Sequence, residues 1–185
     1  EKMYVEKAIA DLKAKQEELP KEALTEEIEP EELPKKNPSQ SIADKVKYYL
    51  RTGVSFTADR LFEIANKIYG GTQAEGKYTV KDAYDAMELA VNQHILESPD
   101  YSTNVGLQDA KRNIDKLQDM LNKIPTQSKR TEEMERFQQY STPPSIAYIA
   151  NWVANITNKD IVLEPSAGIG GLAVFAKKEG AKVIV

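Results

Sequence analysis

A glycine-rich segment near the carboxyl end of the chain has the residue types and spacing of a ligand-binding loop. Residues 160–164 (DIVLE) are typical of a buried strand, residues 165–171 form a glycine-rich turn, and residues 172–178 are typical of a helix. Because glycine has no side chain, a ligand can lie against the backbone N–H groups of such a turn. The sequence GIGGLA (168–173) satisfies the G-x-G-x-x-A pattern, which alone is compatible with nicotinamide, flavin or S-adenosylmethionine binding.

The carboxylate of Glu164 favours one of these ligands over the others. Glu164 is the last residue of the expected strand, and Pro165 ends the strand and fixes the turn. A carboxylate at this edge suits a ligand that carries an ammonium or sulfonium group, and it repels a pyrophosphate. The structural alternative is a strand-end carboxylate that accepts hydrogen bonds from backbone amides.

Several segments typical of helices precede this loop in the sequence. Between residues 41 and 124, four segments with apolar residues at helical spacing and short connections predict a compact bundle. Ser41, Thr57 and Thr79 are the expected amino caps of the first three helices. The expected inward-facing residues are Ile42, Val46, Tyr49, Leu50, Leu61, Ile64, Ala65, Ile68, Ala83, Tyr84, Met87, Val91, Ile95, Leu107, Ala110, Ile114, Leu117 and Leu121.

A fifth helix is expected just before the strand. Thr142 is a suitable amino cap and Pro143 a suitable first helical residue. After the glycine-rich turn and its helix, residues 181–185 are typical of a second strand, which completes a strand–loop–helix–strand unit, the opening half of a doubly wound α/β domain. The apolar residues expected along the fifth helix are Ile146, Ile149, Ala150 and Val153.

Composition divides the chain into four segments. Residues 1–40 combine a charged helix with a Pro/Glu-rich arm, and their eleven acidic and seven basic residues account for the whole net charge of −4. Residues 41–124 are the helical bundle, 125–136 a polar connector, and 137–185 the incomplete beginning of an α/β domain. The expected fold class is therefore mostly α: a helical module followed by the truncated start of a Rossmann-like domain.

Several functional classes are disfavoured by composition. No apolar run approaches the roughly 20 residues that span a bilayer, so no membrane partner is expected. The chain has no cysteine, and its lone His94 has no second His or Cys beside it, so neither a metal site nor a thiolate nucleophile is expected. A packed or rim histidine is the favoured interpretation of His94. The charged first residues lack a secretory signal, which predicts a cytoplasmic protein.

Two motifs together resemble the S-adenosylmethionine-dependent adenine-N6 DNA methyltransferases. Leu163-Glu-Pro-Ser-Ala-Gly168-x-Gly170 is similar to the first motif of that family. Phe137-Gln-Gln-Tyr-Ser-Thr-Pro143 resembles the segment that precedes it and closes over the cofactor, and the two occur in the right order. Residues 62–95 also resemble the region before the methylase in large methyltransferase–helicase polypeptides of phages and mobile elements.

The resemblance implies a cofactor site and a reaction. The lid over S-adenosylmethionine would be Tyr140, Ser141, Thr142 and Pro143, and its methionine and ribose side would be lined by Glu164, Pro165, Ser166, Ala167, Gly168 and Gly170. The reaction would move a methyl group to adenine N6, with DNA as the partner of a longer parent protein. The family's Asn/Asp-Pro-Pro-Tyr/Phe loop, which holds a flipped base, does not follow Gly171. We therefore expect no catalytic residue here, and a fragment that is inactive alone.

Two alternatives remain open: a NAD-type Rossmann oxidoreductase fragment, which Glu164-Pro165 disfavours, and a non-catalytic helical interaction module. A unit with two parallel strands also leaves an apolar sheet edge without a partner. We therefore expect residues 183–185 to contact either the helical bundle or a second copy of the chain.

Overall fold

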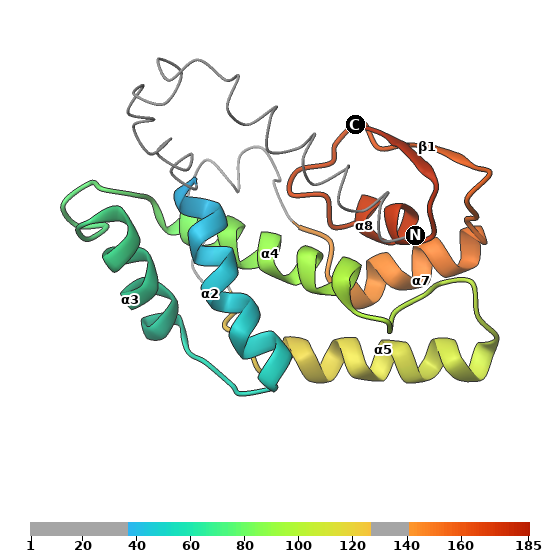
Figure 1. Ribbon diagram of the computed structural model, residues 1–185, viewed down its shortest axis with the longest axis horizontal. Coiled ribbons are helices and arrows are strands. Elements are labelled where there is room, and N and C mark those ends of the chain that lie inside the picture. The colour runs from blue at the N-terminus through green and yellow to red at the C-terminus, as the bar shows by residue number, and fades with distance from the viewer. Residues whose placement is uncertain (1–36, 127–140) are drawn as a thin grey trace, which may run out of the picture. The chain divides into compact units, whose positions relative to one another are not determined.

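Four helices form the first part of the structure, a computed structural model that describes residues 37–126 and 141–185 (Figure 1). They are α2 (Pro38–Thr52), α3 (Ala58–Tyr69), α4 (Val80–Glu97) and α5 (Leu107–Leu121). The four helices predicted between residues 41 and 124 are therefore confirmed. Nearly all of the predicted arm and connector lies outside the described residues.

The caps explain where these helices begin. Thr57 and Thr79 are confirmed as amino caps: the Thr57 hydroxyl accepts a hydrogen bond from the Arg60 backbone N–H at 3.3 Å, and Thr79 forms a reciprocal capping box with Asp82. The prediction that Ser41 begins the first helix was wrong. That helix begins earlier because Asn37 is its cap and a proline, with its preset φ and no N–H to satisfy, occupies its first position.

Helix α4 lies at the centre of the packing, against α2, α3 and α8. The side-chain amides of Gln40 and Gln93 join α2 to α4 through reciprocal hydrogen bonds of 3.2 and 2.8 Å. Most of the predicted inward-facing residues are buried or packed against the core; Leu107, at the first position of α5, is an exception with 53% exposure.

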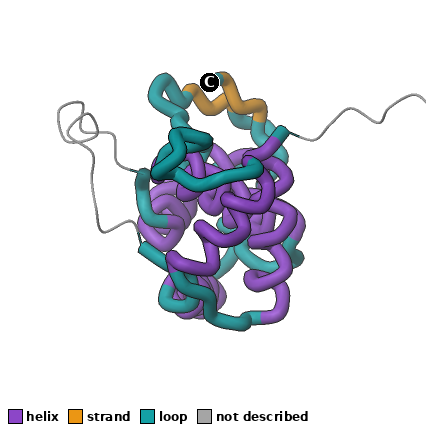
Figure 2. Tube along the Cα trace, turned by 90° about the vertical axis from the view of Figure 1, so that its left-hand side faces the viewer, coloured by secondary structure: helices purple, strands orange, loops and turns teal. Residues whose placement is uncertain are grey.

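The second part of the structure has the predicted strand–helix–strand order. After α7 (Pro144–Ala154) come β1 (Ile161–Leu163), α8 (Ala173–Lys178) and β2 (Lys182–Ile184). The strands are parallel, with Val162 opposite Val183, and they lie together at one end of the helices (Figure 2). The described part of the chain is mostly helical, as predicted. Two short strands do not establish a Rossmann-like domain, so that finer assignment stays a prediction.

Helices α7 and α8 share one hydrophobic core with α2–α5. The rings of Tyr148 on α7 and Phe175 on α8 are both fully buried and meet edge to face, with centroids 5.5 Å apart. Residues 37–126 and 141–185 accordingly belong to a single compact unit. None of the described helices has the length and apolar character needed to cross a membrane.

The structure corrects the prediction for the helix before the strand. Thr142 is not its cap: Pro143 occupies the cap position, and its carbonyl accepts hydrogen bonds from the N–H groups of Ile146 and Ala147 at 2.9 and 3.0 Å. The apolar residues expected along this helix lie largely on its outside, and the sequence had not indicated which face they occupy. Ile146, Ile149 and Val153 are 54%, 37% and 70% exposed, and the buried residues are Ser145, Ala147, Tyr148 and Asn151.

The carboxyl-terminal strand is not covered by the bundle. Ile184 and Val185 are 44% and 79% exposed, so the expected contact between the bundle and this end of the chain is wrong for these two residues. Contact with a second copy of the chain stays a prediction.

Candidate functional site

The glycine-rich turn has a backbone that requires glycine. Gly168 and Gly170 have φ of 52° and 87°, in the region that residues with a side chain rarely adopt. The Gly170 N–H donates to the Ala167 carbonyl at 2.6 Å and closes the turn. A Cβ placed on either glycine would meet no heavy atom within 4 Å. Backbone conformation rather than crowding therefore demands glycine, and the space beside the turn is open.

Glu164 stands at the carboxyl end of β1, as predicted. Its backbone N–H donates to the Ile184 carbonyl at 2.9 Å, and its half-buried carboxylate accepts a hydrogen bond from the Ser166 N–H through Oε1 at 3.2 Å. One carboxylate oxygen of Glu164 therefore accepts a hydrogen bond from a backbone amide, which is the structural alternative to ligand binding. Among the described residues Oε2 has no hydrogen-bond partner, so this carboxylate keeps the capacity to accept from a ligand.

The two motif segments lie against each other. The carbonyl oxygen of Thr142 is 3.6 Å from where a Cβ on Gly171 would be. The Ser141 hydroxyl donates to Oε2 of Glu88 on α4 at 2.5 Å. The structure therefore brings Ser141, Thr142 and Pro143 beside the turn, while Tyr140 lies outside the described residues.

Two buried amides hold the turn and the start of α8, and the sequence analysis missed both. Asn92 on α4, 8% exposed, donates from Nδ2 to the Ile169 carbonyl at 2.8 Å. Asn151 on α7, 5% exposed, donates from Nδ2 to the Leu172 carbonyl at 3.0 Å. For Asn151 the available signal was an amide within an otherwise apolar helical run, because a buried amide needs a partner. Asn92 has no such signal, because Gln93 and His94 follow it directly.

A cavity of about 360 Å³ adjoins the turn. Gly168 and Ile169 form one side of it, and α4 contributes Asp82 and Asp85 to the other. The Asp82 carboxylate accepts from the Thr79 cap, and Asp85 pairs with Lys81. The cavity therefore combines an exposed glycine backbone with two carboxylates. These carboxylates were not among the predicted site residues, because they lie more than 80 residues before Gly168 in the sequence.

Glu88 adds a third carboxyl group to this face of α4. Burial raises its pKa above the ordinary value, and the nearby Asp85 carboxylate acts in the same direction. The hydrogen bond from Ser141 and the charge of Lys81 act in the opposite direction. The segment that contains Ser141 is thus attached to α4 through the Glu88 carboxyl group, which favours its neutral form more than a carboxyl group free in water does.

Comparison with known proteins adds no relative: no protein-family model, no curated protein and no solved structure matches this chain. Within residues 37–126 and 141–185, no group of acidic or histidine side chains is arranged to hold a metal ion.

Proposed function

We propose that this chain belongs to an S-adenosylmethionine-dependent enzyme that methylates adenine N6 in DNA, as a part that holds the cofactor and lacks the base-binding loop. The observation that carries the proposal is the convergence of two motif segments. Thr142 of the first segment lies against Gly171 of the glycine-rich turn, and Gly168 of the same turn lines a cavity with two carboxylates. The parent would act on DNA in the cytoplasm, in a phage or a mobile element.

The charge of the site supports S-adenosylmethionine over a dinucleotide. The cofactor carries a sulfonium and an ammonium group, and Glu164 and Asp82 place negative charge near the turn, while the charge of Asp85 is paired with Lys81. The same carboxylates repel the pyrophosphate of NAD. When bound, the cofactor would supply an activated methyl group. The residues of this chain would bind and orient it, which is how positioning contributes to catalysis.

Equilibrium binding to the 185-residue chain tests the cofactor assignment. We expect S-adenosylmethionine to bind and NAD not to bind in isothermal titration calorimetry. Glu164→Gln should weaken S-adenosylmethionine binding about tenfold, because the negative charge that would face the cationic groups of the cofactor is lost. Gly170→Ala should weaken it as well, because alanine resists a φ of 87°. Asp115→Asn, on the exposed surface of α5, is the matched charge control and should bind normally.

Two results would overturn the assignment: no binding of S-adenosylmethionine at millimolar concentration, or equal binding by the native chain and Glu164→Gln. The methylation step requires the parent protein, in which transfer of labelled methyl groups to adenine-containing DNA is expected. Parent protein that binds the cofactor but transfers nothing would refute the reaction and leave the binding site intact.

A non-catalytic interaction module is the second candidate, because one observation favours it. The exposed apolar residues of α7, Ile146, Ile149 and Val153, form a surface of the kind that contacts other proteins. The calorimetric titration separates the candidates, since an interaction module has no reason to bind S-adenosylmethionine.

A further inference from the structure

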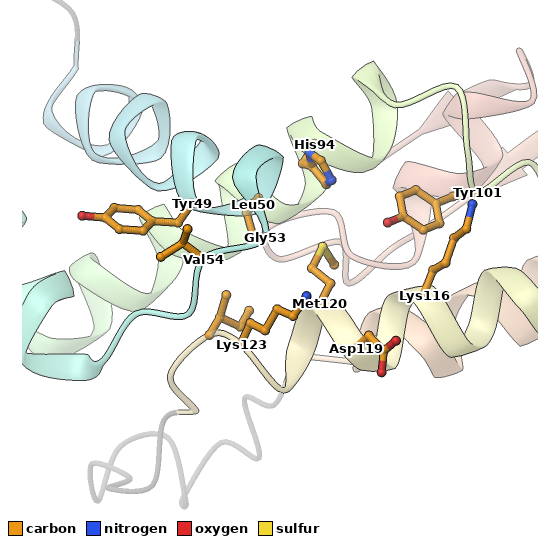
Figure 3. Close-up of a pocket in the computed structure, with 11 residues that line it drawn as sticks. Tyr49, Leu50, Gly53, Val54, His94, Tyr101, Lys116, Asp119, Met120 and Lys123 are labelled. Atoms are coloured by element: carbon orange, nitrogen blue, oxygen red, sulfur yellow. The ribbon is translucent and has the colours of Figure 1, made fainter.

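A second cavity, of about 250 Å³, lies between α2, α4 and α5 and shares no residue with the glycine-rich turn (Figure 3). Leu50, Met120 and Ile124 supply apolar walls. This volume is below the roughly 300–1,000 Å³ of sites for drug-sized ligands, so the cavity suits a smaller molecule.

Tyr101 is held in an uncommon conformation at this cavity. Its φ is 69°, in the left-handed region that bulky residues rarely adopt. The residue is 6% exposed, and its hydroxyl points toward the middle of the cavity. Among the described residues this hydroxyl has no hydrogen-bond partner, and burial raises its pKa, so it remains a protonated donor. The ring is thus nearly buried while the hydroxyl opens onto the cavity, where a ligand could accept its hydrogen bond.

Two further polar groups converge with Tyr101. The imidazole of His94 lies on one side, with its centroid 6.3 Å from the Tyr101 ring, and has no hydrogen bond to the described residues. The Lys123 ammonium extends over Gly53, where it is 3.5 Å from the position of a Cβ, and has no carboxylate partner within the described residues. Lys116 also lines the cavity but pairs with Asp100 at 2.8 Å.

The charge balance favours an anion. Lys123 supplies one ammonium that no carboxylate neutralises among the described residues, and the Asp119 side chain, the acidic group of the lining, points away from the other three (Figure 3). Burial lowers the pKa of His94 and the charge of Arg51 acts in the same direction, while the Glu97 and Asp100 carboxylates act in the opposite direction. The lowered pKa favours the neutral ring, which can donate one N–H. Two neutral donors and one cation fit the acceptor oxygens of an acid.

From these observations we propose that the cavity formed by Tyr101, His94 and Lys123 binds a small organic anion, with one carboxylate or phosphate among these three groups and an apolar body against Leu50 and Met120. The site is independent of the turn and of the proposed methyl transfer. Either assignment can therefore fail without affecting the other.

Titration of the ¹⁵N-labelled chain with phenylacetate, followed by amide chemical shifts, tests the proposal. We expect saturable shifts at and around His94, Tyr101 and Lys123. Phenyl phosphate distinguishes the two head groups. The neutral isostere phenylacetamide should bind at least about tenfold more weakly than phenylacetate, because it lacks the charge that Lys123 meets.

Two conservative variants and two controls complete the test. Tyr101→Phe and Lys123→Gln should each weaken phenylacetate binding about tenfold, because the first removes the hydroxyl donor and the second removes the positive charge. Tyr48→Phe and Lys111→Gln alter exposed residues outside the cavity and should bind as the native chain does. Native-like amide spectra show that each variant is folded. The proposal is wrong if neither anion gives saturable shifts at several millimolar, or if folded Tyr101→Phe and Lys123→Gln both bind normally.

Discussion

The four helices α2–α5 and the segment from α7 to β2 carry the same kind of apolar pattern but use it differently. In the four helices the pattern marks the core: Leu61, Ile95 and Leu117 are fully buried. In α7 the equally spaced Ile149 and Val153 are 37% and 70% exposed, and the inner face carries Tyr148 and Asn151. An apolar stripe at helical spacing therefore identifies a face that prefers to be covered, but it does not tell which element covers it.

The first prediction contrasts one apolar residue from each region. Leu117→Ala should lower the free energy of unfolding by about 2–5 kcal/mol, because it removes a buried side chain and leaves a cavity. Val153→Ala should change it by less than about 0.5 kcal/mol, because that side chain is already largely in water. Urea denaturation followed by circular dichroism measures both. Equal losses in the two variants would show that the stripe on α7 is covered in solution.

The second prediction concerns the polar inner face of α7. Asn151→Ala removes the amide that donates to the carbonyls of Ala147 and Leu172 at 2.8 and 3.0 Å. We expect a loss of about 1–3 kcal/mol in the free energy of unfolding, because the Leu172 carbonyl loses its donor. Asn158→Ala, at an exposed position just after α7, is the matched control and should be nearly neutral. A neutral Asn151→Ala would mean that water replaces the amide and that α7 is packed by its apolar residues alone.

The smallest expected effect is a pH dependence of the free energy of unfolding, which arises where Glu88 on α4 meets Ser141. The folded-state pKa of Glu88 is raised, so the folded chain holds this proton more tightly than the unfolded chain does. Its ionisation therefore reduces stability as the pH rises from about 4 toward 7. Glu88→Gln should remove this part of the decline while keeping an acceptor for Ser141. Ser141→Ala should steepen the decline, because the Ser141 hydrogen bond lowers the pKa of Glu88.

Urea denaturation of the three proteins across that pH range provides the measurement. Identical slopes in the native chain and Glu88→Gln would contradict the prediction.

Local sequence rules located most of the fold. The side chains of Thr57, Thr79 and Asp82 determine helix starts through contacts with their immediate neighbours, so reading the sequence was sufficient. The start of α2 was not predicted correctly because Ser41 also resembles a cap. In the structure Asn37 is the cap instead, and the proline that follows it occupies the first helical position. Cap errors of this kind arise when two suitable residues occur close together.

The candidate site was predictable only in its local part. The positive φ of Gly168 and Gly170 and the place of Glu164 follow from a strand that runs into a glycine-rich turn. The partners from α4, Asn92 and Asp85, could not be predicted because they depend on how α4 packs against α8. That contact joins residues far apart in the sequence and has no signature in either segment alone.

The polar contacts of α7 fix how the helix is rotated about its own axis. A half turn would bury Ile149 and Val153, but it would separate the Tyr148 hydroxyl from the Ser102 carbonyl, 2.8 Å away, and the Trp152 indole N–H from the Val105 carbonyl, 2.9 Å away. A buried carbonyl that loses its donor costs the full free energy of its desolvation. This cost exceeds the net contribution of a hydrogen bond whose groups water could otherwise reach. Directional hydrogen bonds thus outweigh the burial of apolar side chains in orienting α7, and one apolar face of the helix remains exposed to solvent as a consequence.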